Sequence, residues 1–203
     1  KDVVFLNDYA RALPTHKHFR LYDEKHLIPE NKYMNSFIYN NFTEFDDHTA
    51  RILNRKDYNY IVVIKNPYSW YLSYKIHARR CKYDYFKNDV NPHFILEYNS
   101  FYGKWLKFYK EDKKRILIVK YEDLIHDFDN SLEKIKQSLN LEQKASSYTN
   151  INKAPMSRRF NVKRLMYYKK KEYLNMFEKN EKRVINEILD KQIMEFCDYK
   201  LNI

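Results

Sequence analysis

The feature that most constrains the fold is a run of four β-branched apolar residues, Ile61 to Ile64. An uninterrupted run of this kind predicts a strand buried on both faces, as in the interior of a parallel sheet. The run ends at Lys65, and the Asn-Pro pair that follows prevents the strand from continuing. A helix is predicted over residues 68–80, with Ser73 about two turns into it. Ligands of open α/β sheets bind at the carboxyl edge of the strands, so a lysine beside a helix N-terminus predicts an anion site, most simply for a phosphate.

The remaining sequence continues this alternation of strands and helices. A second buried strand is expected at residues 115–120, immediately before Tyr121. Further elements are expected as a short strand at residues 15–21 and helices at 42–54, 98–109, 131–139, 164–178 and 180–197, with irregular segments at 81–93 and 142–163. The alternation predicts a single α/β domain over residues 1–203, with three layers in which helices flank a central parallel sheet.

Charge and cysteine content narrow the class of protein. Thirty-eight Lys and Arg against 27 Asp and Glu give a net charge of +11, which predicts affinity for polyanions without identifying one. Cys81 and Cys197 form neither a disulfide framework nor a metal-ligand spacing, which is typical of a reducing compartment. The sequence shows no signal peptide and no apolar run near the roughly 20 residues that span a bilayer, so we expect a cytoplasmic location.

The scarcity of glycine excludes two kinds of phosphate-binding loop. Gly103 is the only glycine, and it stands in Phe-Tyr-Gly-Lys-Trp, where no Ser or Thr follows the lysine. The chain therefore has neither a G-x-x-x-x-G-K-[ST] loop nor a dinucleotide-binding G-x-G-x-x-G turn. A nucleotide phosphate bound by this chain has to be held by side chains and helix N-termini.

Two segments together resemble the sulfotransferases. They are Ile-Val-Val-Ile-Lys65-Asn-Pro-Tyr-Ser-Trp-Tyr-Leu-Ser73 and the later Ile-Leu-Ile-Val-Lys-Tyr121-Glu-Asp-Leu. The resemblance covers about residues 15–140 and implies a P-loop-NTPase-like architecture, with 3′-phosphoadenosine 5′-phosphosulfate as donor. In that family a strand ends in Arg-Asn-Pro, and this arginine and a serine eight residues later hold the 3′-phosphate of the donor. Lys65 and Ser73 match that spacing, although lysine keeps the charge and loses the bidentate fork of arginine.

The resemblance also implies roles for residues outside this strand and helix. Tyr121 matches a Tyr-Glu-Asp element that lies beside the adenine in the family. Lys17 and His18 fall where the family often has a Lys/His pair, in which the histidine removes the proton of the acceptor hydroxyl. His16 and His26 remain alternatives to His18 as the base. No metal is required by this chemistry, and no ligand cluster in the sequence indicates one.

A basic segment near residue 158 is the predicted counterpart of a loop that closes over the donor in sulfotransferases. Ser157, Arg158 and Arg159 match that loop by position and charge. The alternative is a solvated basic surface, which is also the interpretation of the Lys169–Lys171 run. Aromatic side chains are candidates for an acceptor cleft or for the core: Tyr83, Tyr85, Phe86 and Trp105.

Each donor-site residue also has a plainer interpretation. Lys65 would then be a strand-end lysine that points to solvent, Ser73 would bond back to a helix carbonyl, and Tyr121 would be packing at a strand end. One part of the family pattern is missing, because residues 1–14 contain nothing like the Gly-, Ser- and Thr-rich loop that binds the 5′-phosphosulfate. Since the sequence begins at Lys1, we expect that loop to precede it; the alternative is a non-catalytic relative.

The function predicted from the sequence is transfer of a sulfuryl group to a hydroxyl of a carbohydrate or glycoconjugate. A non-catalytic protein that binds polyanions or nucleic acid is the alternative, since the positive charge and the tyrosines could hold phosphates and stack bases. No recognised nucleic-acid motif is present, however. A P-loop nucleotide kinase shares the α/β architecture but would need the loop that Gly103 does not provide.

Overall fold

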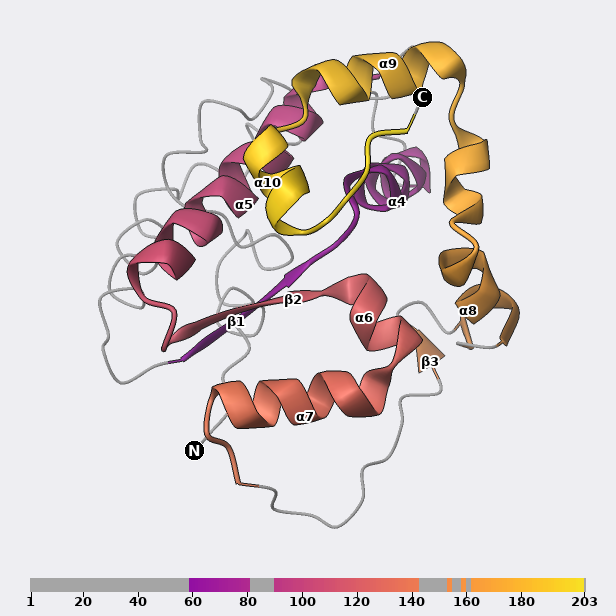
Figure 1. Cartoon of the computed structure of the whole chain (residues 1–203). Coiled ribbons are helices and arrows are strands. Elements are labelled where there is room, and N and C mark those ends of the chain that lie inside the picture. Colours follow the sequence, from indigo (N-terminus) through magenta and orange to yellow (C-terminus); the bar gives the residue numbers. More distant parts are fainter. Residues whose placement is uncertain (1–58, 81–89, 143–152, 155–157, 160–161, 203) are drawn as a thin grey trace.

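The computed structural model of the chain describes residues 59–80, 90–142, 153–154, 158–159 and 162–202 (Figure 1). Its centre is a pair of parallel strands, β1 (Tyr60–Ile64) and β2 (Ile116–Lys120). Their register places Ile64 opposite Lys120. The residues that follow the two strands, Lys65 and Tyr121, therefore emerge side by side at the same edge of the sheet, as predicted for an α/β fold.

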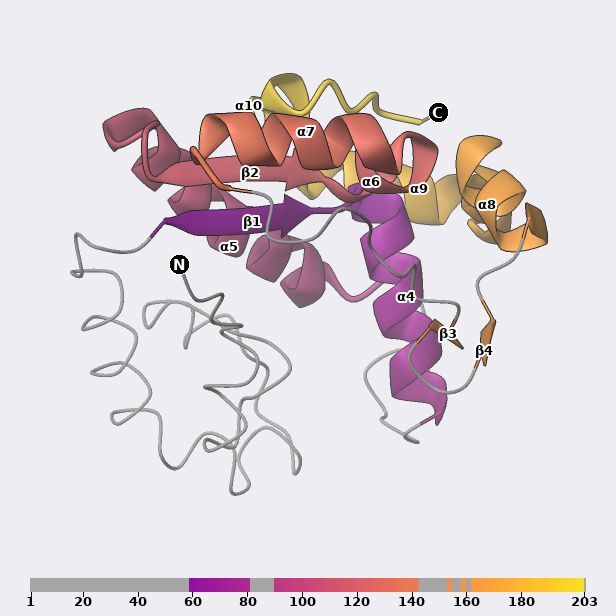
Figure 2. The same cartoon turned by 90° about the horizontal axis from the view of Figure 1, so that it is seen from below.

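Helices make up most of the rest of the described structure. α4 (Pro67–Arg80) and α5 (Pro92–Glu111) connect the two strands, and β2 is followed by α6 (Tyr121–His126), α7 (Phe128–Ser138), α8 (Val162–Lys169), the 3-10 helix η4 (Glu172–Met176), α9 (Lys179–Ile188) and α10 (Lys191–Phe196). A short antiparallel pair, β3 (Lys153–Ala154) and β4 (Arg158–Arg159), precedes α8. α5 and α7 lie on opposite sides of the strands, and α4 turns steeply away from the end of β1 (Figures 1 and 2). None of these described helices is long and apolar enough to cross a membrane.

β1 is buried on one face only. Tyr60, Val62 and Ile64 belong to the core, whereas Ile61 and Val63 are 45% and 44% exposed. The prediction of a strand buried on both faces is therefore wrong for β1. A run of β-branched residues shows that every position favours a pleated strand, but it does not show which face the helices cover.

α5 supplies the aromatic side of the core. Phe94, Tyr98, Tyr102 and Trp105 recur at helical spacing, and each is at most 9% exposed. The sequence left Trp105 open between core and acceptor cleft; it lies in the core, with its ring centroid 5.8 Å from that of Tyr60. The helix starts earlier than predicted because Phe94, in its first turn, is also fully buried.

The turn after β1 starts α4 directly behind Lys65. The side-chain oxygen of Asn66 accepts a hydrogen bond from the N–H of Tyr68 (3.2 Å), and the Asn66 carbonyl accepts one from the N–H of Trp70 (2.8 Å). Asn66 thus caps the helix, and Pro67 occupies the first helical position, where its missing N–H breaks no bond. The Asn-Pro pair therefore both ends the strand and begins the helix.

The last two predicted helices are each divided in two. The helix predicted at 164–178 is α8 and η4, separated at Lys171, whose φ of 53° is left-handed and cannot continue an α-helix. The helix predicted at 180–197 is α9 and α10, and the side chain of Asp190 caps the start of the second. Hydrophobic spacing was continuous across both breaks, so it could not reveal them.

The C-terminal segment returns to the first turn of α4. The N–H of Asn202 donates to the hydroxyl of Tyr68 (3.0 Å), and the side-chain amide of Asn186 donates to the Asn202 carbonyl (2.8 Å). The Tyr68 hydroxyl in turn donates to the side-chain oxygen of Asn186. These bonds join α4, α9 and the last described residues in one network beside the carboxyl edge of the sheet (Figure 1).

Candidate anion-binding site

Lys65 and Ser73 meet at the carboxyl end of β1. The ammonium nitrogen of Lys65 donates to the hydroxyl oxygen of Ser73 at 2.8 Å, and this hydroxyl donates to the carbonyl of Ser69 at 2.9 Å. The bond back to the helix carbonyl was one of the plainer interpretations of the serine, and it coexists with the contact to the lysine. The lysine does not simply point to solvent, since it is half-buried. Spacing of eight residues therefore brings a cation and a hydroxyl together.

Two tyrosine rings enclose the Lys65 ammonium. Its nitrogen lies 5.2 Å from the ring centroid of Tyr121 and 5.3 Å from that of Tyr168. The two rings are 5.6 Å apart and nearly perpendicular. Both distances are within the range of a cation–π interaction, which compensates partly for the hydration that the ammonium loses. Tyr168 was missed by sequence reasoning because nothing distinguishes it from the other 19 of the 20 tyrosines.

The groups around Lys65 shift the pKa of its ammonium. Burial lowers the pKa of Lys65, Tyr168 and Glu122 partly oppose this shift, and the nearby positive charge of Arg164 adds to it. Arg164 precedes Tyr168 by one turn of α8, so this helix brings both a ring and a second cation to the site. Burial raises the pKa of Tyr121, so its hydroxyl stays protonated and available as a donor. With the N-terminus of α4 close by, the site combines two cations and several hydroxyl donors.

Other predicted site residues are not placed with these side chains. Lys17, His18 and Ser157 lie outside the described residues, as do the alternative bases His16 and His26. The backbone of Arg158 and Arg159 forms β4, which pairs with β3 just ahead of α8 in the chain. Their proposed roles therefore remain predictions.

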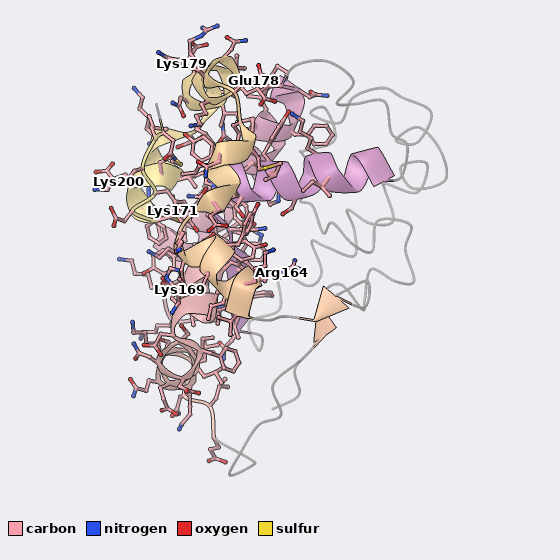
Figure 3. The ribbon with its side chains drawn as sticks, turned by 90° about the vertical axis from the view of Figure 1, so that its right-hand side faces the viewer. Arg164, Lys169, Lys171, Glu178, Lys179 and Lys200 are labelled. Carbon is pink, nitrogen blue, oxygen red and sulfur yellow. The ribbon has the colours of Figure 1, made fainter. Side chains whose placement is uncertain are left out.

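Figure 3 shows the basic residues of the C-terminal helices. Lys169, at the end of α8, and Lys171, just before η4, point outward, whereas Arg164 lies on another side of α8. All three residues of the Lys169–Lys171 run are exposed, which confirms their interpretation as surface. No group of three His, Cys, Asp or Glu in the described segments could hold a metal ion.

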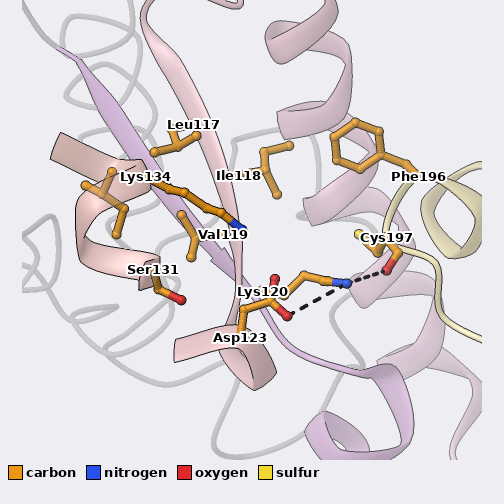
Figure 4. A pocket seen from close by; sticks show the side chains of 10 residues that line it. Leu117, Ile118, Val119, Lys120, Asp123, Ser131, Lys134, Phe196 and Cys197 are labelled. Atoms are coloured by element: carbon orange, nitrogen blue, oxygen red, sulfur yellow. Dashed lines mark hydrogen bonds and ion pairs between the residues drawn. The ribbon is translucent and has the colours of Figure 1, made fainter. Parts of the chain in front are cut away.

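A separate hollow lies beside β2, between α7 and α10 (Figure 4). Its volume is about 230 Å³, and Ile118, Lys120, Ser131 and Phe196 are among its lining residues. The Lys120 ammonium donates to the carbonyl of Cys197 at 3.3 Å and lies 3.9 Å from a carboxylate oxygen of Asp123. The site residues Lys65, Ser73, Tyr121, Tyr168 and Arg164 do not line this hollow, so we assign it no part in the anion-binding site.

Comparison with known proteins identifies a family. A family model described as the sulfotransferase domain matches residues 42–200, which include every described residue of the site. Comparison with curated proteins gives no match. Comparison with solved structures gives none either.

Proposed function

The chain belongs to the sulfotransferase domain family, and we propose that its donor is 3′-phosphoadenosine 5′-phosphosulfate and that Lys65 and Ser73 hold the 3′-phosphate. As a family member it is a transferase enzyme that moves a sulfuryl group. The observation that carries the donor proposal is the 2.8 Å contact between Lys65 and Ser73 at the carboxyl end of β1. A phosphate dianion at this point would replace the contact between the two side chains with charge-assisted hydrogen bonds to both.

The rest of the described site supports an anion in this position. Arg164 supplies a second positive charge, and the hydroxyls of Tyr121 and Tyr168 are donors at the same edge. We propose that Tyr121 also lies beside the adenine and that Ser157, Arg158 and Arg159 close over the phosphate, as the family pattern implies. Arg164 and Tyr168 are additions to the set predicted from the sequence.

The proposed reaction needs no metal. The acceptor oxygen attacks the sulfur in line with the departing 5′-phosphate oxygen, His18 takes the hydroxyl proton, and adenosine 3′,5′-bisphosphate leaves. Lys17 neutralises charge that develops on the transferred group or on the leaving phosphate. We propose a carbohydrate or glycoconjugate as acceptor because the chain has a net charge of +11 and such acceptors are often anionic.

The proposal extends to the whole chain. We propose that residues 1–203 form one domain with the three-layer, P-loop-NTPase-like architecture of the sulfotransferases. In that architecture, further parallel strands would extend the β1–β2 pair. The small number of cysteines is the reason to place the enzyme in a reducing compartment, the cytoplasm.

Nucleotide binding tests the donor proposal. Isothermal titration of the chain with adenosine 3′,5′-bisphosphate should give micromolar affinity, about −8 kcal/mol. Adenosine 5′-monophosphate, which lacks the 3′-phosphate, should bind at least roughly tenfold more weakly, because one set of charge-assisted bonds is missing. Equal affinity for the two nucleotides would contradict the proposal. Weak binding of both, with steeply salt-dependent binding of long polynucleotides, would favour the polyanion-binding alternative.

Affinity for the bisphosphate should also fall at alkaline pH. A dianionic phosphate binds the protonated form of Lys65, and the pKa of this lysine in the free protein is lower than usual. Binding should therefore weaken as the pH rises through that pKa, by up to about tenfold for each pH unit above it. Titrations between pH 7 and 10 measure the effect. The Lys65→Arg variant is the control, because arginine keeps its charge over this range and its affinity should stay nearly constant.

A further inference from the structure

The peptide group between Lys65 and Asn66 is held at both of its polar atoms. Its carbonyl oxygen, on Lys65, accepts a hydrogen bond from the hydroxyl of Tyr98 at 2.8 Å. Its N–H, on Asn66, donates to a carboxylate oxygen of Glu122 at 2.9 Å. Tyr98 belongs to α5 and Glu122 to α6, so the two partners come from different helices. Because a peptide group is a rigid plane, two bonds at its opposite ends fix its rotation.

The second carboxylate oxygen of Glu122 is also engaged. It accepts a hydrogen bond from the hydroxyl of Tyr199 at 2.8 Å. Burial and the charge of Glu122 raise the pKa of Tyr199, so this hydroxyl stays protonated and keeps donating. Glu122 therefore joins three parts of the chain: the end of β1, the start of α6 and the segment after α10. It lies one residue beyond Tyr121, which places it between the two strand ends that carry the anion-binding site.

We infer that Glu122 is a positioning residue, which aims the Lys65 side chain at the anion-binding site by fixing the Lys65–Asn66 peptide group together with Tyr98. Lysine carries its charge on a flexible four-carbon stem and lacks the planar fork of arginine. The position of its ammonium therefore depends on how its backbone is oriented. A fixed backbone keeps the ammonium on Ser73 and between the two tyrosine rings. This inference rests on the proposed donor site, but it also makes a claim about the free protein.

In the free protein, chemical labelling tests the inference without any nucleotide. The rate at which acetic anhydride acetylates Lys65 is measured by mass spectrometry over a series of pH values in wild type and in Glu122→Ala, because loss of the Glu122 charge also lowers the Lys65 pKa. The rate constant of the unprotonated amine, which is independent of that pKa, should be several-fold larger in the variant because the lysine leaves its contact with Ser73 more often. Lys75, which lies on α4 and pairs with Glu181 of α9, should be acetylated at the same rate in both proteins. An unchanged rate at Lys75 would show that the variant is still folded. An unchanged rate for Lys65 would overturn the inference, whatever nucleotide the protein binds.

Tyrosine variants give a matched comparison. Tyr98 donates to the Lys65 carbonyl, whereas the hydroxyl of Tyr71, on α4, accepts from the N–H of Asn91 at 2.8 Å. Phenylalanine removes one hydroxyl from a buried ring in each case. We expect Tyr98→Phe to accelerate labelling of Lys65 and Tyr71→Phe to leave it within about twofold of wild type. Equal effects of the two variants would show that general loosening of the core, and not the orientation of the peptide group, controls the lysine.

A double-mutant cycle then tests the link to the donor. Glu122→Ala should weaken binding of adenosine 3′,5′-bisphosphate roughly tenfold, within the range of couplings measured inside one hydrogen-bond network. In a Lys65→Ala background the same substitution should cost less than about twofold, because the residue through which Glu122 acts is absent. Affinity for adenosine 5′-monophosphate should be unaffected by Glu122→Ala, and Glu122→Gln should restore part of the loss.

Two results separate the inference from the donor proposal. An equal loss in both backgrounds, or an equal loss for the two nucleotides, would overturn positioning through Lys65 while leaving the donor proposal intact. If wild type itself does not distinguish the two nucleotides, the donor proposal fails. The labelling rates still decide whether Glu122 positions the lysine in that case.

Discussion

Replacing Lys65 by alanine is expected to weaken binding of adenosine 3′,5′-bisphosphate roughly 10- to 150-fold, since one charge-assisted phosphate contact contributes about 1.5–3 kcal/mol. The loss of affinity should be limited to nucleotides that carry a 3′-phosphate. Adenosine 5′-monophosphate should therefore bind the variant about as well as wild type. Isothermal titration with the two nucleotides measures both affinities, and circular dichroism shows whether the variant is folded.

Two controls make this result specific to the site. Lys65→Arg keeps the charge and should retain most of the affinity. Lys169→Ala removes the same charge from an exposed position of α8 and should change the affinity less than about twofold. If Lys65→Ala binds as tightly as wild type, or if Lys169→Ala has the same effect, the anion is not held where we propose.

The largest expected effect on stability comes from Lys75, which pairs with Glu181. Their charged atoms are 2.5 Å apart, and the side chains are only 13% and 14% exposed. Lys75→Met removes the cation from the nearly buried carboxylate of Glu181, which keeps only the weaker compensation of hydrogen bonds such as the one from the N–H of Glu178 at 3.0 Å. We expect the free energy of unfolding to fall by about 2–4 kcal/mol, somewhat less than for fully buried pairs. Urea unfolding monitored by circular dichroism measures the difference.

The matched control is an exposed ion pair on the same helix, α9. Arg183 and Glu187 form a 2.7 Å pair, but their side chains are 63% and 58% exposed. Arg183→Met should change the free energy of unfolding by no more than about 0.5–1 kcal/mol, because solvent screens this pair. Similar losses in the two variants would mean that burial does not determine the contribution of the Lys75 pair. That pair joins α4, which carries Ser73, to α9, so its loss should also loosen the anion-binding site.

The contacts that could be predicted from the sequence are those made within short stretches of the chain. Lys65 and Ser73 are eight residues apart, and a strand end followed by a helix start leaves little freedom in how they meet. Tyr121, which is distant in sequence, was predicted only because it matches the Tyr-Glu-Asp element of the sulfotransferases; the parallel pairing of the two strands is what brings it to the same edge as Lys65.

The contacts that could not be predicted join segments far apart in the sequence. Tyr168 reaches Lys65 only because α8 packs beside α6, and Tyr199 reaches Glu122 across 77 residues. Neither residue has a local signal, since both are tyrosines in a chain with 20 of them. The incorrect prediction for β1 has the same origin: which face of a strand is covered depends on helices distant in sequence, and not on the strand itself.

The network that the C-terminal segment forms has a consequence for the order of events during protein synthesis. Tyr68 and its partner Asn202 are 134 residues apart, so a ribosome that adds 5–20 residues per second needs roughly 7 to 27 seconds to travel from one to the other. Once Arg80 has been added, β1 and α4 are both translated, whereas Tyr199, whose phenol donates to Glu122, is added only near the end of that interval. A nascent chain can therefore form the Lys65–Ser73 contact early, yet it can complete the support of that contact only after Tyr199 has been translated.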